Sequence, residues 1–179
     1  MSYYRCIVDV VRGVTEIDDQ VFVAFKDSRE LFAYHADTFQ QFRVLSVHGL
    51  NDPRDMVVCR DDRQLYVAET DCIWRVSSST EQQQHQYVKW LTTESTFHIG
   101  TLSLTSRHLL VTSQSLSLRQ YGTTDGQLLR DVQLPQFVKV MWHAVETTRG
   151  TFVVGHQGTS HDKQQFAVSS LFIWYLSVL

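Results

Sequence analysis

The stretch Leu50–Ser77, LNDPRDMVVCRDDRQLYVAETDCIWRVS, decides the fold of this chain. It contains the apolar runs Met56–Cys59, Leu65–Ala68 and Cys72–Val76, which charged residues separate. Short runs of β-branched and aromatic residues between polar turns are typical of antiparallel strands joined by hairpins. Apolar residues do not recur three and four positions apart, so the stretch predicts strands rather than helices.

The same pattern recurs along the chain. The segment Gln64–Glu69 matches Gln20–Phe25 before it, and His108–Ser113 and Thr151–His156 after it. Its central valine recurs as Val23, Val67, Val111 and Val154, with spacings of 44, 44 and 43 residues. A period of about forty residues with about four strands per repeat is the signature of β-propeller blades. The sequence therefore predicts one all-β, propeller-like domain over residues 1–179, with four four-stranded blades at about 10–47, 53–91, 97–134 and 136–179.

The end of the chain departs from this pattern. In the fourth blade we expect strands at Val138–Val145, Phe152–Gly155 and Phe166–Ser170, followed by the uncharged run Leu171–Leu179. This run is shorter than the roughly twenty apolar residues that a membrane-spanning helix needs. We interpret it as a last strand, with a truncated end as the alternative. Blades that form an open arc leave apolar faces uncovered, which predicts self-association.

Composition narrows the class of protein. Hydrophobic residues make up 43% of the 179 residues, which is enough for one well-buried domain. The 16 basic and 19 acidic residues give a net charge of -3, so the chain lacks the basic signature of a protein that binds nucleic acid or anionic membranes. Asp9 and Arg12 interrupt the apolar N-terminal residues, which argues against a secretory signal.

The cysteines indicate a reducing compartment. Cys6, Cys59 and Cys72 are odd in number and include no close pair. Cys59 ends the first predicted strand of its blade and Cys72 begins the third, and these strands are not neighbours in a meander. We therefore expect buried free thiols and a cytoplasmic location.

Candidate metal ligands are scattered. His48, His98, His143 and His156 fall near predicted strand ends, and a metal in the channel would need ligands at equivalent positions of successive blades. A constant repeat offset aligns His143 with Gly100, so we expect neither a metal site nor a cofactor. Asp55 and Glu69, facing the channel, could instead bind a hard cation such as calcium. No catalytic motif is present, which predicts no catalytic residues.

Aromatic and arginine side chains near strand ends are the candidates for partner binding. Their ordinary role would be packing between blades, whereas the functional interpretation is a peptide-binding hot spot, where Trp, Tyr and Arg are enriched. The candidate residues are Arg54, Tyr66, Trp74, Arg75, Trp90, Arg119 and Trp142.

Blade two resembles the NHL repeat. The resemblance rests on Pro53, on Met56–Val58, on Leu65–Glu69 and on Ile73–Val76, with Glu69 where the family usually has aspartate. It implies an open-channel propeller, commonly of six blades, that binds proteins or sometimes RNA, so the present chain would be an incomplete fragment. In the tripartite-motif ubiquitin ligases this propeller recognises the substrate, and a minority of related propellers are metal-dependent lactonases or lyases.

These observations together predict a non-enzymatic interaction module that binds a protein or peptide through its rim and channel mouth. Two alternatives stay open at this point. One is a metal-dependent hydrolase or lyase of the propeller type, and the other is a truncated gene product with no independent activity.

Overall fold

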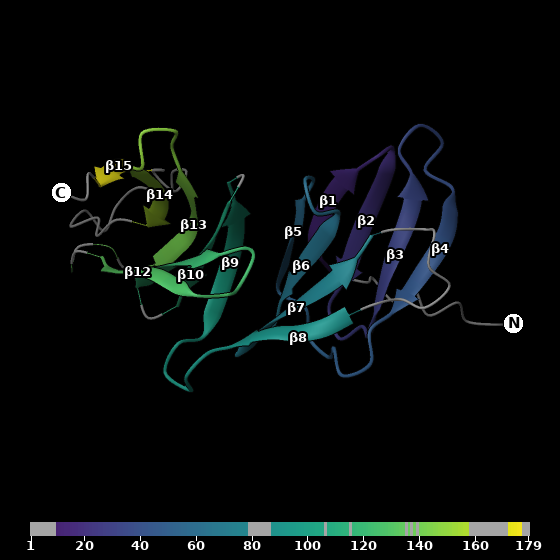
Figure 1. Cartoon of the computed structure of the whole chain (residues 1–179), viewed down its shortest axis with the longest axis horizontal. Helices are drawn as coiled ribbons and strands as arrows, with labels where there is room; N and C mark the ends of the chain where they lie inside the picture. The colour runs from purple at the N-terminus through teal and green to yellow at the C-terminus, as the bar shows by residue number, and fades with distance from the viewer. Residues whose placement is uncertain are drawn as a thin grey trace, which may run out of the picture.

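The structure is a computed structural model that describes residues 10–78, 87–157 and 172–176, except residues 106, 115, 135, 137 and 139. All regular structure in these residues is β-strand, and it forms four separate antiparallel sheets, numbered here in chain order (Figure 1). This part of the chain has no helix that is long and apolar enough to cross a membrane. The all-β prediction is confirmed.

Each sheet is a meander in which strands that follow one another in sequence pair side by side. Sheet 1 contains β1 (Val11–Ile17), β2 (Gln20–Phe25), β3 (Glu30–His35) and β4 (Gln41–Ser46). Sheet 2 contains β5 (Asp55–Cys59), β6 (Gln64–Ala68), β7 (Cys72–Ser77) and β8 (Tyr87–Thr92). Sheet 3 contains β9 (Ile99–Leu104), β10 (His108–Ser113), β11 (Ser117–Gly122) and β12 (Leu128–Gln133). Sheet 4 contains β13 (Val140–Glu146), β14 (Phe152–Gln157) and β15 (Phe172–Leu176).

Sheet 4 differs from the expectation in one respect. The predicted third strand, Phe166–Ser170, lies outside the described residues. The apolar segment Phe172–Leu176, expected as the last strand, pairs directly with β14, with Val154 opposite Trp174. The terminal apolar run therefore occupies the third position of the sheet.

The first strands of the four sheets lie next to one another. β1 contacts β5, β5 contacts β9 and β9 contacts β13, and no comparable contact joins β1 to β13 among the described strands. The hairpins that follow these first strands all lie at the same edge of the molecule, at the top of Figure 1. In the first of them, Asp18 and Asp19 have φ angles of 48° and 58°. Two residues with positive φ form the type I′ turn, whose twist suits a tight hairpin.

The burial of the second strands shows that the sheets form an open arc. Along β6 and β10 nearly every residue is buried, because a sheet packs on each face. Along β2 burial alternates, and the same alternation recurs in β14 from Phe152 to His156. Sheets 1 and 4 are therefore the two ends of the arc, and each keeps one face without a neighbouring sheet in the described part of the chain.

Two glycines allow close packing between sheets 1 and 2. A Cβ atom on Gly13 would lie 2.7 Å from the backbone nitrogen of Met56, so β1 approaches β5 more closely than any other residue would permit. Gly49 has a φ of 100° and lies against the ring of Trp74, where a Cβ would meet the ring at 2.9 Å. Both positions require glycine because a side chain has neither the space nor, at Gly49, the backbone conformation.

Candidate functional site: the central channel

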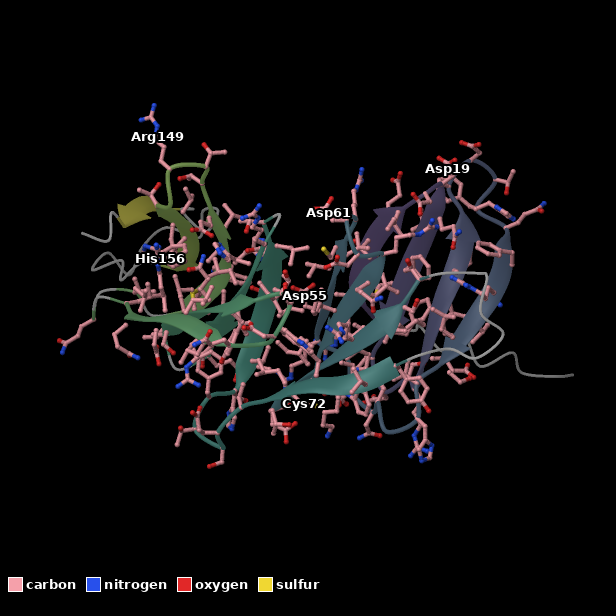
Figure 2. All side chains as sticks on the ribbon, viewed as in Figure 1. Asp19, Asp55, Asp61, Cys72, Arg149 and His156 are labelled. Carbon is pink, nitrogen blue, oxygen red and sulfur yellow. The ribbon has the colours of Figure 1, made fainter. Side chains whose placement is uncertain are left out.

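The four first strands line an open pocket of about 570 Å³ at the centre of the arc. Every sheet contributes to its wall, because residues in or directly beside all four first strands line it. The charged and polar lining residues are Arg12 and Thr15 from β1, Arg54 and Asp55 at the start of β5, Thr101 and Ser103 from β9, and His143 from β13. Figure 2 shows Asp55 near the middle of the molecule, between the two pairs of sheets.

Asp55, Thr101 and His143 occupy equivalent positions in successive sheets. Each directly precedes the residue that pairs with the recurring valine of the second strand. These pairs are Met56 with Val67, Leu102 with Val111, and Ala144 with Val154. The Nδ1 atom of His143 lies 3.2 Å from the Thr101 hydroxyl, so the two side chains meet across the junction of sheets 3 and 4. The expected alignment of His143 with Gly100 is therefore wrong by one residue.

Asp55 joins sheet 2 to sheet 3. Its carboxylate accepts hydrogen bonds from the backbone N–H of Met56 and from that of Leu102 on β9, each at 2.8 Å. Burial raises the pKa of the Asp55 carboxyl above its ordinary value, while these two donors and the charge of His143 act in the opposite direction. The carboxylate is thus largely engaged by the protein itself.

Arg54 lies beside Asp55 at the channel wall. Its Nε donates to the Thr70 hydroxyl at 3.0 Å, which holds the side chain along the β6–β7 turn. With Arg12 from β1 and His143 from β13, it gives the channel two guanidinium groups and one imidazole against the single carboxylate of Asp55. The channel is therefore suited to a ligand that carries negative charge.

Three of the aromatic candidates pack between sheets. Trp74 is 6% exposed and lies in the core between sheets 1 and 2. Tyr66 is fully buried between sheets 2 and 3, and its hydroxyl donates to the Thr123 carbonyl at 3.2 Å. Trp90 packs against Tyr66, with the rings 5.1 Å apart in an edge-on arrangement. These positions fit packing between blades, the ordinary role expected for the aromatic residues.

The other candidates are more accessible, to different degrees. Trp142 is 54% exposed and directly precedes His143 on β13. Arg75 is half-buried on β7, opposite Tyr66. Arg119 is held in place: its guanidinium pairs with Glu94 and Asp131 and lies over the Phe97 ring. Of the seven candidates, Arg54 alone contributes to the wall of the channel.

Glu69 does not face the channel, which corrects the expectation of a cation site shared with Asp55. Its Oε1 accepts from the backbone N–H groups of Asn51 and Asp52, at 2.7 and 3.1 Å. Its Oε2 accepts from the Trp74 indole at 2.7 Å and from the Cys72 thiol at 3.2 Å. Burial alone would raise the pKa of Glu69, but these four donors lower it below the ordinary value.

Two of the cysteines behave as predicted. Cys59 and Cys72 are buried and free, whereas Cys6 lies outside the described residues. Burial, together with the adjacent Glu69 carboxylate, raises the pKa of Cys72 to about 12. No group of three or more His, Cys, Asp or Glu side chains with the geometry of a metal site occurs in the described part of the chain.

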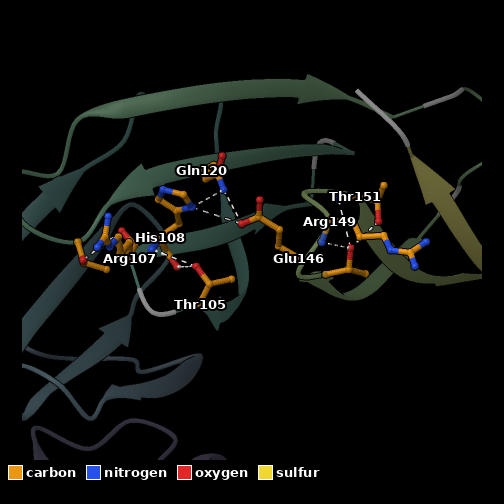
Figure 3. A network of polar contacts seen from close by, with 9 residues as sticks. Thr105, Arg107, His108, Gln120, Glu146, Arg149 and Thr151 are labelled. Atoms are coloured by element: carbon orange, nitrogen blue, oxygen red, sulfur yellow. Dashed lines mark hydrogen bonds and ion pairs between the residues drawn. The ribbon is translucent and has the colours of Figure 1, made fainter. Parts of the chain in front are cut away.

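A polar network at the junction of sheets 3 and 4 was not anticipated from the sequence (Figure 3). The Glu146 carboxylate accepts from the Gln120 amide at 2.6 Å, and it lies 3.5 Å from Nδ1 of His108. Gln120 also contacts His108, at 3.0 Å. The sequence carries no local signal for this contact, because the three residues are on β10, β11 and β13 and meet only when the sheets pack.

Comparisons with known proteins support the fold. No protein-family model matches the sequence, and no curated protein is significantly similar to it. Among solved structures, the chain is similar to the computationally designed Ika4 protein, with a TM-score of 0.65 and 15% identity over 95% of this chain and 93% of that one. The β-propeller domain of Cps50 (Swd1) from Myceliophteria thermophila gives a TM-score of 0.63 and 8% identity, over 92% of this chain and 57% of that one. The WD40 β-propeller domain of Doa1 gives a TM-score of 0.62 and 14% identity, over 82% of this chain and 47% of that one.

The similarities and the four radiating sheets define the chain as a β-propeller, with the sheets as its blades. It spans about half the length of the Cps50 and Doa1 chains. The prediction of a partial, open propeller is consistent with both observations.

Proposed function

We propose that this protein is a non-enzymatic interaction module that binds an acidic segment of a partner protein at the mouth of its central channel. The observation that carries the proposal is the composition of the channel wall. All four sheets contribute to it, and Arg12, Arg54 and His143 line an open pocket of about 570 Å³ together with a single carboxylate, that of Asp55. A cavity formed by several rigid strands can hold a bound side chain with little loss of conformational entropy.

The chemistry of the wall favours a carboxylate over a cation. Asp55 already accepts two backbone N–H groups, so it has little capacity left for a positively charged ligand. A ligand carboxylate could accept hydrogen bonds from guanidinium groups, which bind this anion in a bidentate, charge-assisted manner. Trp142, exposed on the strand that carries His143, offers an adjacent apolar contact of the kind that is enriched in binding hot spots.

Selection from a random peptide library displayed on phage tests the proposal. We expect enriched peptides to carry Asp or Glu, and their affinity for the wild-type protein to be measurable by fluorescence anisotropy. Arg54→Ala should weaken binding about 10-fold or more, because a hydrogen bond between charged groups contributes roughly 1.5–3 kcal/mol. Arg130→Ala, on the outer strand β12 and exposed, is the matched control and should leave the affinity unchanged.

Two results would contradict the proposal. One is a set of enriched peptides that bind the wild type and Arg54→Ala equally well. The other is the absence of any enriched peptide together with tight binding of a single-stranded RNA oligonucleotide.

Two narrower assignments belong to the same proposal. The NHL-type character is supported by the motif of sheet 2, where Pro53 precedes β5 and Leu65–Glu69 follows the first turn. A cytoplasmic location is supported by the buried free thiols of Cys59 and Cys72, since thiols of secreted proteins are usually paired.

A further inference from the structure

The open face of sheet 1 has the composition of an interior face. Val14, Val23, Phe32 and Val44 lie in register across β1, β2, β3 and β4 and form a continuous apolar row. Val14 is 57% exposed, and the other three are half-buried. We call these four residues the leading row.

The same row is covered in the three other sheets. The residues equivalent to Val14 are Met56, Leu102 and Ala144, and each is at most 2% exposed. Met56 packs on sheet 1, Leu102 on sheet 2 and Ala144 on sheet 3. The leading row of sheet 1 is therefore a surface built to receive a preceding sheet, and the described part of the chain supplies none.

Sheet 4 carries the complementary surface. Val145 on β13 pairs with Val153 on β14, on the face of sheet 4 that points away from sheet 3. Val145 is 41% exposed, and Val153 is half-buried. In sheet 1 the position equivalent to Val153 is Phe22, which is fully buried against sheet 2. We call Val145 and Val153 the trailing pair.

We propose that two copies of this chain form a closed ring, in which the leading row of each copy packs against the trailing pair of the other. The chain aligns with 57% of the Cps50 propeller chain and with 47% of the Doa1 WD40 propeller chain. Two copies of this chain would therefore contain about as much structure as one of those propeller chains. A two-fold axis uses both open faces of both copies and leaves neither exposed.

The charges at the rim match this arrangement. Within the chain, Arg63 in the β5–β6 turn forms an ion pair of 2.6 Å with Asp18 in the β1–β2 turn, so turns of successive sheets meet at this edge. At the junction between copies, the β13–β14 turn of one copy would meet the β1–β2 turn of the other. The first carries Arg149 and the second carries Asp19, both exposed and both at the top edge in Figure 2. The charges at the junction are therefore opposite, as they are within the chain.

Light scattering coupled to size-exclusion chromatography, at micromolar protein, is the primary test. We expect the wild type to have twice the monomer mass, and Val14→Glu and Val145→Glu each to give the monomer. Val88→Glu is the matched control, since the 47% exposure of Val88 lies between those of Val14 and Val145, but Val88 is on the outer strand β8. A monomeric wild type, or a dimer that Val88→Glu also dissociates, would overturn the proposal.

Two further experiments separate this pairing from others. Mixing Val14→Glu with Val145→Glu chains should restore a dimer, because the mixed pair retains one wild-type junction. If Val14→Glu alone abolishes the dimer while Val145→Glu does not, two copies of sheet 1 pack on each other and the proposal is wrong.

Asp19→Arg and Arg149→Asp should each weaken the dimer, and the double variant should recover it. A series of ever larger oligomers would exclude a closed pair.

Discussion

The Glu69 carboxylate makes the sharpest prediction about stability. It is 9% exposed and accepts four hydrogen bonds, two from the backbone of the β4–β5 connection and two from side chains of sheet 2. Replacing it with glutamine keeps the size and shape of the side chain but leaves one acceptor oxygen and adds an NH₂ donor. Glu69→Gln therefore tests the hydrogen bonds with little change in packing.

The expected cost follows from the two orientations that the amide can adopt. With its oxygen towards the Trp74 indole, its NH₂ group faces the backbone N–H groups of Asn51 and Asp52, and those donors lose their acceptor. With its oxygen towards the backbone, the indole N–H loses its acceptor instead. Either orientation loses one or two bonds to a charged acceptor at roughly 1.5–3 kcal/mol each, so we expect a loss of about 3 kcal/mol. For a chain of this size, that loss corresponds to a fall in Tm of about 6–12 °C.

Thermal unfolding followed by circular dichroism and tryptophan fluorescence measures this loss. Comparisons need equal protein concentrations, because association makes Tm depend on concentration. Glu30→Gln is the matched control, since within the described part of the chain the Glu30 carboxylate accepts only one long bond, 3.4 Å from the Ser46 hydroxyl. A Glu69→Gln variant as stable as Glu30→Gln would refute the role assigned to the carboxylate.

The other predictions concern pH, backbone packing and thiol reactivity. Because folding lowers the pKa of Glu69, the stability that the Glu69 carboxylate contributes is complete above the ordinary glutamate pKa and is lost as pH falls through the folded-state pKa. The difference in unfolding free energy between wild type and Glu69→Gln, measured by urea unfolding, should therefore stay constant from pH 8 to about 5 and narrow below about 4. Gly13→Ala should lower the free energy of unfolding by roughly 1–3 kcal/mol in the same assay, because the new Cβ would meet the backbone of Met56. Gly122→Ala is the control and should lower it less, because that Cβ would meet only the flexible Asp125 side chain. Equal losses in the two variants would contradict the packing argument. Cys72, with a pKa of about 12, should resist iodoacetamide at pH 8 in the native protein and react after denaturation. Rapid labelling of native Cys72, located by mass spectrometry, would contradict this expectation.

The repeat made most of the strands predictable from the sequence. Each second strand packs against a neighbouring sheet on at least one face, and Gln64–Ala68 packs on both, so the apolar residues of these strands stand out at a constant spacing. The ends of the strands shifted by only one or two residues, as for the predicted Val138–Val145 and the observed Val140–Glu146. Hydrophobic periodicity is a property of each repeat, so it survives without knowledge of how the repeats pack.

The channel wall was less predictable because the first hairpins differ in length. In sheet 1 the residue opposite the recurring Val23 is Val14, nine positions earlier. In sheet 2 the residue opposite the recurring Val67 is Met56, eleven positions earlier. A constant offset taken from the second strands therefore misplaces residues of the first strands, which is why His143 was aligned with Gly100. Glu69 was misassigned for a different reason: its partners Asn51 and Asp52 belong to the connection from the preceding sheet, and the sequence does not indicate that contact.

The residues that do not repeat explain why the sheets pack in one order. Apolar rows of similar composition would allow any sheet to pack on any other, so they supply stability without selecting a neighbour. Each junction adds a polar contact of its own. Glu69 binds the β4–β5 connection to Trp74, Tyr66 bonds to Thr123 in the β11–β12 turn, and Glu146 binds Gln120 across sheets 3 and 4. A wrong neighbour would leave a buried polar group unpaired, which costs roughly 1–3 kcal/mol, so these contacts add a preference for the observed neighbour that the apolar rows alone do not supply.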